Sequence, residues 1–170
     1  MDARRTDVSE TARSLGGLDS PSYTYACAID TAVTGASAEE WARATFEEAP
    51  TAVRLVIVSG WRLALRLRLL PRTSPSSVLG WRILSSTPPA IVLATDSPLL
   101  TARLVVQVDG ARVVHTTLVR TERRLGRVVW AAATPIHQLT IPFLLNHAAA
   151  ERRRVAEDAG TRRSGVRASS

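Results

Sequence analysis

Residues 90–121 have the sequence AIVLATDSPLLTARLVVQVDGARVVHTTLVRT, and this stretch decides the fold class. It contains three runs rich in Val, Leu, Ile and Thr, the composition typical of β-strands. Asp96-Ser97-Pro98 separates the first two runs. Asp109-Gly110, a type I′ hairpin signal, separates the last two. Because these connections are short, the sequence predicts antiparallel strands over 90–95, 100–108 and 111–121.

The strand pattern continues on both sides of this stretch. A run at 79–85 ends before Thr87-Pro88-Pro89, and a run at 127–133 follows a turn that ends at Gly126. These runs complete a predicted meander of five strands. A further strand is predicted over 23–31, where Tyr, Thr and Ile occur with no helix cap before them. The expected sheet therefore has about six strands.

Helix signals lie between the first strand and the meander. Ser37 and Glu40 have the spacing of a capping box, and the helix that follows carries Glu39, Arg43 and Glu47 four residues apart, before Pro50. The stretch 51–70 is ambiguous. Its alternation over 61–69 has strand period, but its length and its arginines, which fall on about half of a helix circumference, favour a helix bent at Ser59-Gly60.

A long helix is predicted to close the chain. Thr134-Pro135 supplies an N-cap and a proline at the first helical position, so the helix is expected over 135–152, with a kink at Pro142. The 170 residues are the length of one domain. Residues 21–153 are expected to fold, with flexible tails at 1–20 and, rich in Arg, at 154–170.

Composition excludes several classes of protein. All 22 basic residues are Arg, which indicates a high-GC genome and makes the net charge of +7 modest evidence for a polyanionic partner. The single cysteine, Cys27, excludes an internal disulfide framework and fits a reducing, cytoplasmic compartment. No targeting segment is visible. Four arginines in the most apolar stretch, 52–70, argue against a transmembrane segment there.

The order of these elements gives an α+β domain in which a curved antiparallel sheet wraps on the long C-terminal helix. This layout resembles the helix-grip fold of the START and polyketide-cyclase-like (SRPBCC) superfamily. SAEEWAR at 37–43, VLGWRI at 78–83 and TPIH at 134–137 resemble an uncharacterised bacterial family within it. The resemblance covers about residues 23–150. It implies a cavity between sheet and helix that takes a hydrophobic ligand, with no assigned reaction.

Strand parity predicts which side chains face that cavity. With the arginines of each strand turned to solvent, the candidates on the inward face include aromatic, polar and aliphatic residues. The predicted ligand-binding residues are Trp81, Ile83, His115, Thr117, Trp130 and, near the rim by resemblance, His137. Apolar walls with a few polar groups are typical of a ligand pocket. The alternatives are that Trp81 and Trp130 simply fill the core, and that His115 and His137 make only local hydrogen bonds.

These residues predict that the protein binds a small molecule rather than catalyses a reaction. No nucleophile motif, Gly-rich phosphate loop or metal-ligand spacing is present, so no catalytic residue, cofactor or metal is predicted. The expected partner is a small hydrophobic or amphipathic molecule, with no specific nucleic acid. The alternative is a polyketide cyclase- or dehydratase-like enzyme with a pocket His as general acid/base. A weaker alternative is a contact of the Arg-rich C-terminal tail with an anionic surface.

Overall fold

The computed structural model of the chain describes residues 2–71 and 74–167, with the backbone alone over 159–167. Its seven strands are β1 (Arg4–Thr6), β2 (Tyr23–Asp30), β3 (Ser77–Val78), β4 (Trp81–Thr87), β5 (Ala90–Asp96), β6 (Leu100–Asp109) and β7 (Arg112–Thr121). Its helices are α1 (Glu10–Gly16), α2 (Ala38–Phe46), α3 (Thr51–Ser59), the π-helical turn η1 (Gly60–Ala64) and α4 (Arg124–Arg167). The predicted α+β class is confirmed.

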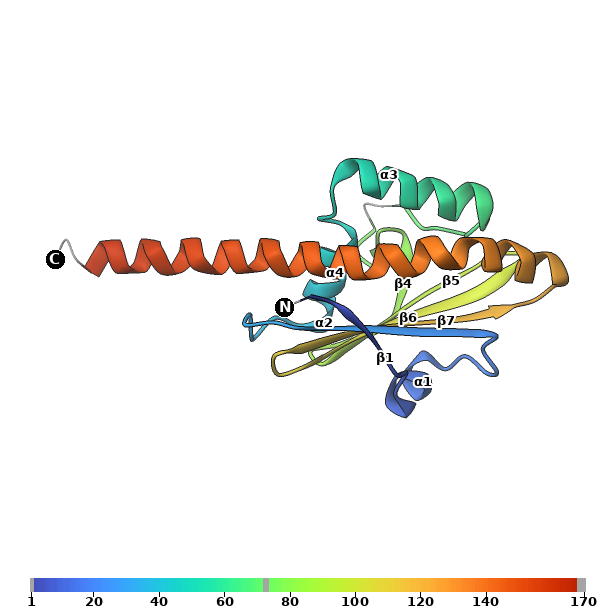
Figure 1. The fold of residues 1–170 in the computed structure, drawn as a ribbon, viewed down its shortest axis with the longest axis horizontal. Helices are drawn as coiled ribbons and strands as arrows, with labels where there is room; N and C mark the ends of the chain where they lie inside the picture. The colour runs from blue at the N-terminus through green and yellow to red at the C-terminus, as the bar shows by residue number, and fades with distance from the viewer. Residues whose placement is uncertain (1, 72–73, 168–170) are drawn as a thin grey trace.

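The strands form one antiparallel sheet in the order β1-β2-β7-β6-β5-β4-β3. We define its inner face as the one that carries Cys27, His115, Val106 and Ile91, which are register partners across β2, β7, β6 and β5. Helix α4 contacts the sheet through β2 and β7. Figure 1 shows α3 and α4 on one side of the sheet and α1 on the other. The inner face is therefore the one that the long helix covers.

The hairpin between β6 and β7 is confirmed, but its turn differs from the prediction. Asp109 pairs with Arg112, so the two loop residues are Gly110 and Ala111. Gly110 has φ +56°, whereas Asp109 is not among the described residues with positive φ. A type I′ turn centred on Asp109-Gly110 needs positive φ at both residues, and a type II′ turn needs glycine at the first loop position. The prediction of a type I′ turn was wrong because the ladder extends to Asp109.

Helix α2 follows its sequence signals. The Ser37 Oγ accepts from the Glu40 main-chain N–H at 3.3 Å, and the Glu40 carboxylate accepts from the Ser37 N–H at 2.7 Å, which confirms the capping box. Arg43 pairs with Glu39 at 2.9 Å and with Glu47 at 3.2 Å. Arg152 of α4 donates to the Glu40 carbonyl at 2.7 Å, so α2 and α4 are tied together at this end.

The first part of the stretch 51–70 is helical, and its last part follows the strand-like alternation, so each of the two predicted structures describes one part of it. It is helical over α3 and widens to the π-helical turn η1 at Gly60, where a bend was predicted. Beyond Ala64 the chain is not helical, and Leu65 and Leu67 are buried while Arg66 and Arg68 are exposed. The strand-like alternation therefore governs the end of the stretch, because each second leucine reaches the core.

The strand predicted over 127–133 is wrong, since these residues are helical and α4 already begins at Arg124. Trp130, Ile141 and Leu144 are buried on one side of that helix, so burial at helical spacing outweighs the local strand preference of Val128-Val129-Trp130. The prediction that the helix starts at Pro135 is wrong for the same reason. Pro135 and Pro142 both lie inside α4.

Both predicted tails contain regular structure. Residues 4–6 pair with β2, and α1 packs Ala12 and Gly16 against the outer face of β6 and β7. Figure 1 shows α4 extending past the sheet toward the C-terminus. The outer face had been expected to be wet along β7, but α1 covers part of it, and Thr116 and Leu118 are buried there.

Candidate functional site

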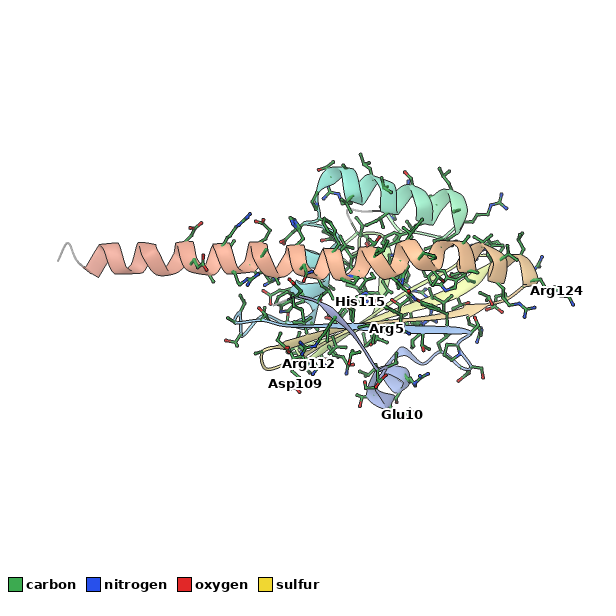
Figure 2. The ribbon with its side chains drawn as sticks, in the orientation of Figure 1. Arg5, Glu10, Asp109, Arg112, His115 and Arg124 are labelled. Atoms are coloured by element: carbon green, nitrogen blue, oxygen red, sulfur yellow. The ribbon has the colours of Figure 1, made fainter. Side chains whose placement is uncertain are left out.

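The inner face brings together side chains from β2, β4 and β7 and from α4. Across the sheet, Thr117 lies in one register row with Tyr25 on β2 and, through β6 and β5, with Ile83 on β4. His115 lies two residues before Thr117 and therefore points to the same face. The predicted inward direction of β7 is confirmed. Figure 2 shows His115 between the sheet and α4.

Three of the predicted residues meet in what we name the tyrosine–histidine cluster, which consists of Tyr23, Tyr25, Thr117, Trp130 and His137. The His137 ring lies edge-on to Tyr25, with ring centroids 5.4 Å apart, and is tilted against Trp130, with ring centroids 5.5 Å apart. Its Nε2 is 3.1 Å from the Thr117 hydroxyl, and its Nδ1 is 3.4 Å from the Tyr23 hydroxyl. Both ring nitrogens of His137 therefore have partners.

Pro142 links this cluster to the backbone of α4. A proline has no N–H, so it leaves the carbonyl four residues earlier, that of Gln138, without its helical partner. The Tyr25 hydroxyl lies 3.5 Å from that carbonyl, and the Gln138 side chain donates to the Tyr23 hydroxyl at 3.4 Å. The two tyrosines of β2 thus position α4 over the sheet.

Two of the other predicted residues, Trp81 and His115, belong to the tryptophan cluster, which consists of Phe46, Trp61, Trp81 and His115. The Trp61 ring of η1 lies 5.5 Å from Trp81 and 6.2 Å from Phe46, centroid to centroid. Phe46 in turn lies 5.8 Å from the His115 ring. Ile83 is half-buried beside this cluster on the same face of β4. Together the two clusters span the inner face from β2 to β4.

Several buried polar atoms on this face have no hydrogen-bond partner. Among the described residues these include Nε1 of Trp81, Nε1 of Trp130 and both ring nitrogens of His115. His115 is fully buried, and Trp81 is 4% exposed. A buried donor or acceptor without a partner costs roughly 1–3 kcal/mol, so such groups are rare in folded proteins. Four of the eight such atoms among the described residues belong to these three side chains.

Both inner-face histidines are neutral at physiological pH. Burial, and secondarily the nearby His137, lowers the pKa of His115 to about 3, against a small opposing effect of its own main chain. Burial lowers the pKa of His137 to about 4. No charged residue is among the buried residues of the described chain. The site is therefore polar in places but uncharged.

Other reactive groups nearby are poorly placed for catalysis. Burial raises the pKa of the Cys27 thiol, which keeps it protonated and unreactive. Burial likewise raises the pKa of Tyr25 to about 12. Within residues 2–71 and 74–158, no group of three or more His, Cys, Asp or Glu side chains is arranged to hold a metal ion.

Sequence reasoning missed Tyr23, Tyr25, Phe46 and Trp61 as members of the site. Strand parity could have found the tyrosines, because Tyr23 and Tyr25 alternate with Thr24 and Ala26 on β2. Phe46 lies on the buried side of α2, and nothing in its local sequence distinguishes a site residue from an ordinary core residue. Trp61 had no detectable signal, because its direction depends on the π-helical turn.

The stretch Arg124–Asp158 of α4 has the length and apolar composition of a membrane span, and only 22% of its most apolar window is buried inside the domain. Helices that form the core of a folded domain can have the same composition. Here Leu144, Leu145, Ala148 and Ala149 are buried in the hydrophobic core, so this helix is part of a compact domain.

Residues 18–144 match one family, described as "Protein of unknown function (DUF2867)". No curated protein matches the sequence. The matched region starts just before β2 and ends within the buried part of α4, so it contains both aromatic clusters.

Proposed function

Starting from the DUF2867 family, to which this chain belongs, we propose that the protein binds a small hydrophobic or amphipathic molecule between the inner face of the sheet and α4. The observation that carries this proposal is the group of buried, unpartnered polar atoms on His115, Trp81 and Trp130. A ligand with a hydrogen-bonding group would supply the missing partners, while its apolar part would replace solvent against the aromatic rings.

The polar groups restrict the chemistry of the ligand. An indole N–H can only donate, so Trp81 and Trp130 call for an acceptor such as a carbonyl, ether or hydroxyl oxygen. Neutral His115 can donate from one nitrogen and accept at the other. Because the buried residues include no charged side chain, an ionised group would lie there without a counter-charge. The ligand we propose is therefore uncharged.

The loose packing of α3 would allow a ligand to reach the inner face of the sheet. None of the residues of α3 or η1 is fully buried, although Val53, Ile57, Val58 and Trp61 pack against the core. A helix held by half-buried side chains opens at lower cost than one with a fully buried face. We infer that α3 and η1 move aside when the ligand enters.

The enzymatic alternative is less well supported. A general acid/base works best with a pKa near the working pH. Burial holds the pKa values of His115 and His137 at about 3 and about 4, which makes both rings weak bases. His137 is also held by Thr117 and Tyr23. A binding role needs neither ring to change its protonation state.

We also propose a fold family and a source for this protein. The order of one long strand, two helices, an antiparallel meander and a long final helix is compatible with a helix-grip fold. We propose that the family belongs to the START and polyketide-cyclase-like superfamily and acts in the cytoplasm of a bacterium with a high-GC genome. The all-arginine basic composition and the buried single thiol of Cys27 support that setting.

Titration with Nile red, an uncharged apolar dye with a carbonyl acceptor, tests the binding proposal. We expect saturable dye fluorescence and quenching of tryptophan emission, and native mass spectrometry of the purified protein is expected to detect a bound small molecule. Trp130→Phe, which keeps a ring beside Tyr23 but removes the indole N–H, should weaken binding about fivefold or more.

The matched control is Trp41→Phe. Trp41 also has a buried, unpartnered Nε1, but it lies on α2 beneath the Arg152 guanidinium, 5.0 Å from its ring centroid, and belongs to neither cluster. This variant should bind the dye like the wild type. Non-saturable dye binding with no co-purified molecule would refute the proposal, as would equal effects of the two substitutions.

A further inference from the structure

The solvent-facing side of α4 is apolar along its first half. Between Val128 and Phe143, each exposed residue is Val, Ala, Pro, Ile, Leu or Phe. Val128 is 67% exposed, Ile136 66% and Leu139 76%. At roughly 100° per residue these positions fall within about 80° of arc, so they form one continuous stripe. Because these side chains face solvent, packing in the core does not account for their apolar character.

The side of α4 that packs on the sheet lies opposite this stripe. Trp130, Ile141 and Leu144 are buried and fall roughly half a turn away from Val128, Ile136 and Leu139. A helix with one side fixed to a sheet cannot leave the domain to span a bilayer without exposing that side. The stripe is suited to lie on an apolar surface rather than to cross it.

The neighbouring segment has the same character. Val56 of α3 is 69% exposed and Leu63 of η1 is 81% exposed. In Figure 1, α3 lies on the same side of the sheet as α4, and α1 lies on the other side. Large exposed apolar residues thus concentrate on α4 and on the α3–η1 segment. We name Val56, Leu63, Val128, Ile136, Leu139 and Phe143 the apolar helix face.

Every charged residue in the segments that carry the apolar helix face is an arginine, and the flanking acidic residues Asp96 and Glu122 pair with Arg68 and Arg120 at 3.1 Å each. Residues 49–95 and 123–150, which contain α3, η1 and the first half of α4, include arginines but no Asp or Glu. Arg62, Arg66, Arg124 and Arg127 are exposed. Figure 2 places Arg124 at the start of α4, and Glu10 and Asp109 on the side of the molecule where α1 lies. The positive charge therefore accompanies the apolar residues.

From this combination we propose that the apolar helix face docks on a bilayer that contains anionic phospholipid. Apolar side chains enter the acyl boundary, and the arginines meet the phosphate groups, as in helices that lie in the membrane interface. A second copy of the chain fits less well, because two such faces would bring arginines together with no carboxylate between them. This inference goes beyond the proposed ligand binding and does not rest on it.

Flotation of the full chain with vesicles tests the inference. We expect binding to phosphatidylglycerol–phosphatidylcholine vesicles, little binding to pure phosphatidylcholine, and weakening by salt, since screening reduces the attraction of arginines to lipid. Leu139→Gln with Phe143→Gln should reduce partitioning about tenfold or more, because two exposed apolar groups are lost. Arg124→Gln with Arg127→Gln should reduce it about fivefold per arginine.

The controls use residues of the same type on other elements. Leu84→Gln on β4 and Leu15→Gln on α1 remove side chains that are 47% and 41% exposed, and should leave vesicle binding unchanged. Arg112→Gln, at the β6–β7 hairpin, removes an arginine outside the apolar helix face and is the control for the arginine substitutions on α4. Circular dichroism should give the same spectrum for all variants. If the Leu139/Phe143 pair fails to fold, Val56→Gln with Leu63→Gln on the other segment replaces it.

Three results would overturn the inference. The first is failure of the wild type to float with anionic vesicles. The second is equal binding by the control and stripe variants. The third is a wild-type dimer that the stripe substitution dissociates while vesicle binding is unchanged, which would make the face an interface between copies. Saturable Nile red binding is measured in parallel, so failure of docking and failure of ligand binding are separate results.

Discussion

His115 and Thr117, two residues apart on β7, share the inner face but differ in their hydrogen bonds. Thr117 holds the Nε2 of His137 at 3.1 Å, whereas neither ring nitrogen of His115 has a partner. The loss of a partner from a buried polar group costs free energy, but replacing an unpartnered group by an apolar one of similar shape does not. The two positions should therefore respond in opposite ways to apolar substitution.

We expect His115→Leu to leave the free energy of unfolding unchanged or to raise it, and Thr117→Val to lower it by about 1–2 kcal/mol. Urea unfolding of both variants in the absence of ligand measures this. Nile red titration of His115→Leu should give weaker binding in a protein that is at least as stable. A loss of stability in His115→Leu similar to that in Thr117→Val would indicate that His115 has a partner within the chain.

The buried histidines also predict how stability depends on pH. Their pKa values of about 3 and about 4 lie below the unfolded value near 6.5, so between these limits the unfolded chain binds more protons. The stabilising contribution of the two neutral histidines is then fully present above about pH 6.5. The free energy of unfolding falls as the pH decreases toward 4. Between about pH 7 and pH 5, each histidine should remove about 2 kcal/mol from the free energy of unfolding.

Urea unfolding at the two pH values measures this loss, and His115→Leu should show about half of it. Carboxylates contribute mainly at lower pH. A hydrogen bond from Ser86, for example, lowers the pKa of Glu39 below its ordinary value. A pH dependence that is the same in the wild type and in His115→Leu would contradict the proposed burial of a neutral imidazole.

At the scale of the element, the β6–β7 hairpin depends on one backbone conformation. Gly110 has φ +56°, and an added Cβ would meet no atom within 4 Å, so only the backbone resists substitution. Gly110→Val should lower the free energy of unfolding by about 1 kcal/mol or more, because a β-branched residue strongly disfavours positive φ. Thermal unfolding of the variant measures this loss of stability. Ala111→Val is the control at the other loop residue, and equal effects would argue against a requirement for glycine at position 110.

Helix α1 depends on a close approach rather than on a turn. A Cβ on Gly16 would collide with the Leu118 side chain of β7, whereas Gly60 has open space around it. Gly16→Val should therefore release α1 from the outer face, and Gly60→Val should not. Tryptic cleavage at Arg13 measures the release. Rapid cleavage at Arg13 in the wild type would instead agree with a flexible N-terminal segment.

The elements differed in how well the sequence predicted them. The strands at 90–121 and the start of α2 were predictable because alternation, turn residues and a capping box agree there. The start of α4 was not, because Val128-Val129-Trp130 prefers a strand locally and Thr134-Pro135 imitates a helix start. In the structure Thr134 donates to the Trp130 carbonyl at 2.9 Å, inside a continuous helix.

At the scale of the whole molecule, the candidate site was predictable only in part. Parity placed Trp81, Ile83, His115 and Thr117 on one face, but the neighbours Phe46 and Trp61 reach that face from separate helical segments. Trp130 joins the site from a helix rather than from the predicted strand. Local patterns cannot determine contacts that depend on how a helix lies across a sheet.

The two outermost strands are very short, with three residues in β1 and two in β3. A long, uncharged border strand offers a row of free N–H and C=O groups on which another chain can polymerise. Here β1 carries Arg4 and Arg5 and covers the middle of β2, and β3 covers only the start of β4. Neither β1 nor β3 therefore offers the long, uncharged row of free backbone groups on which fibrils grow.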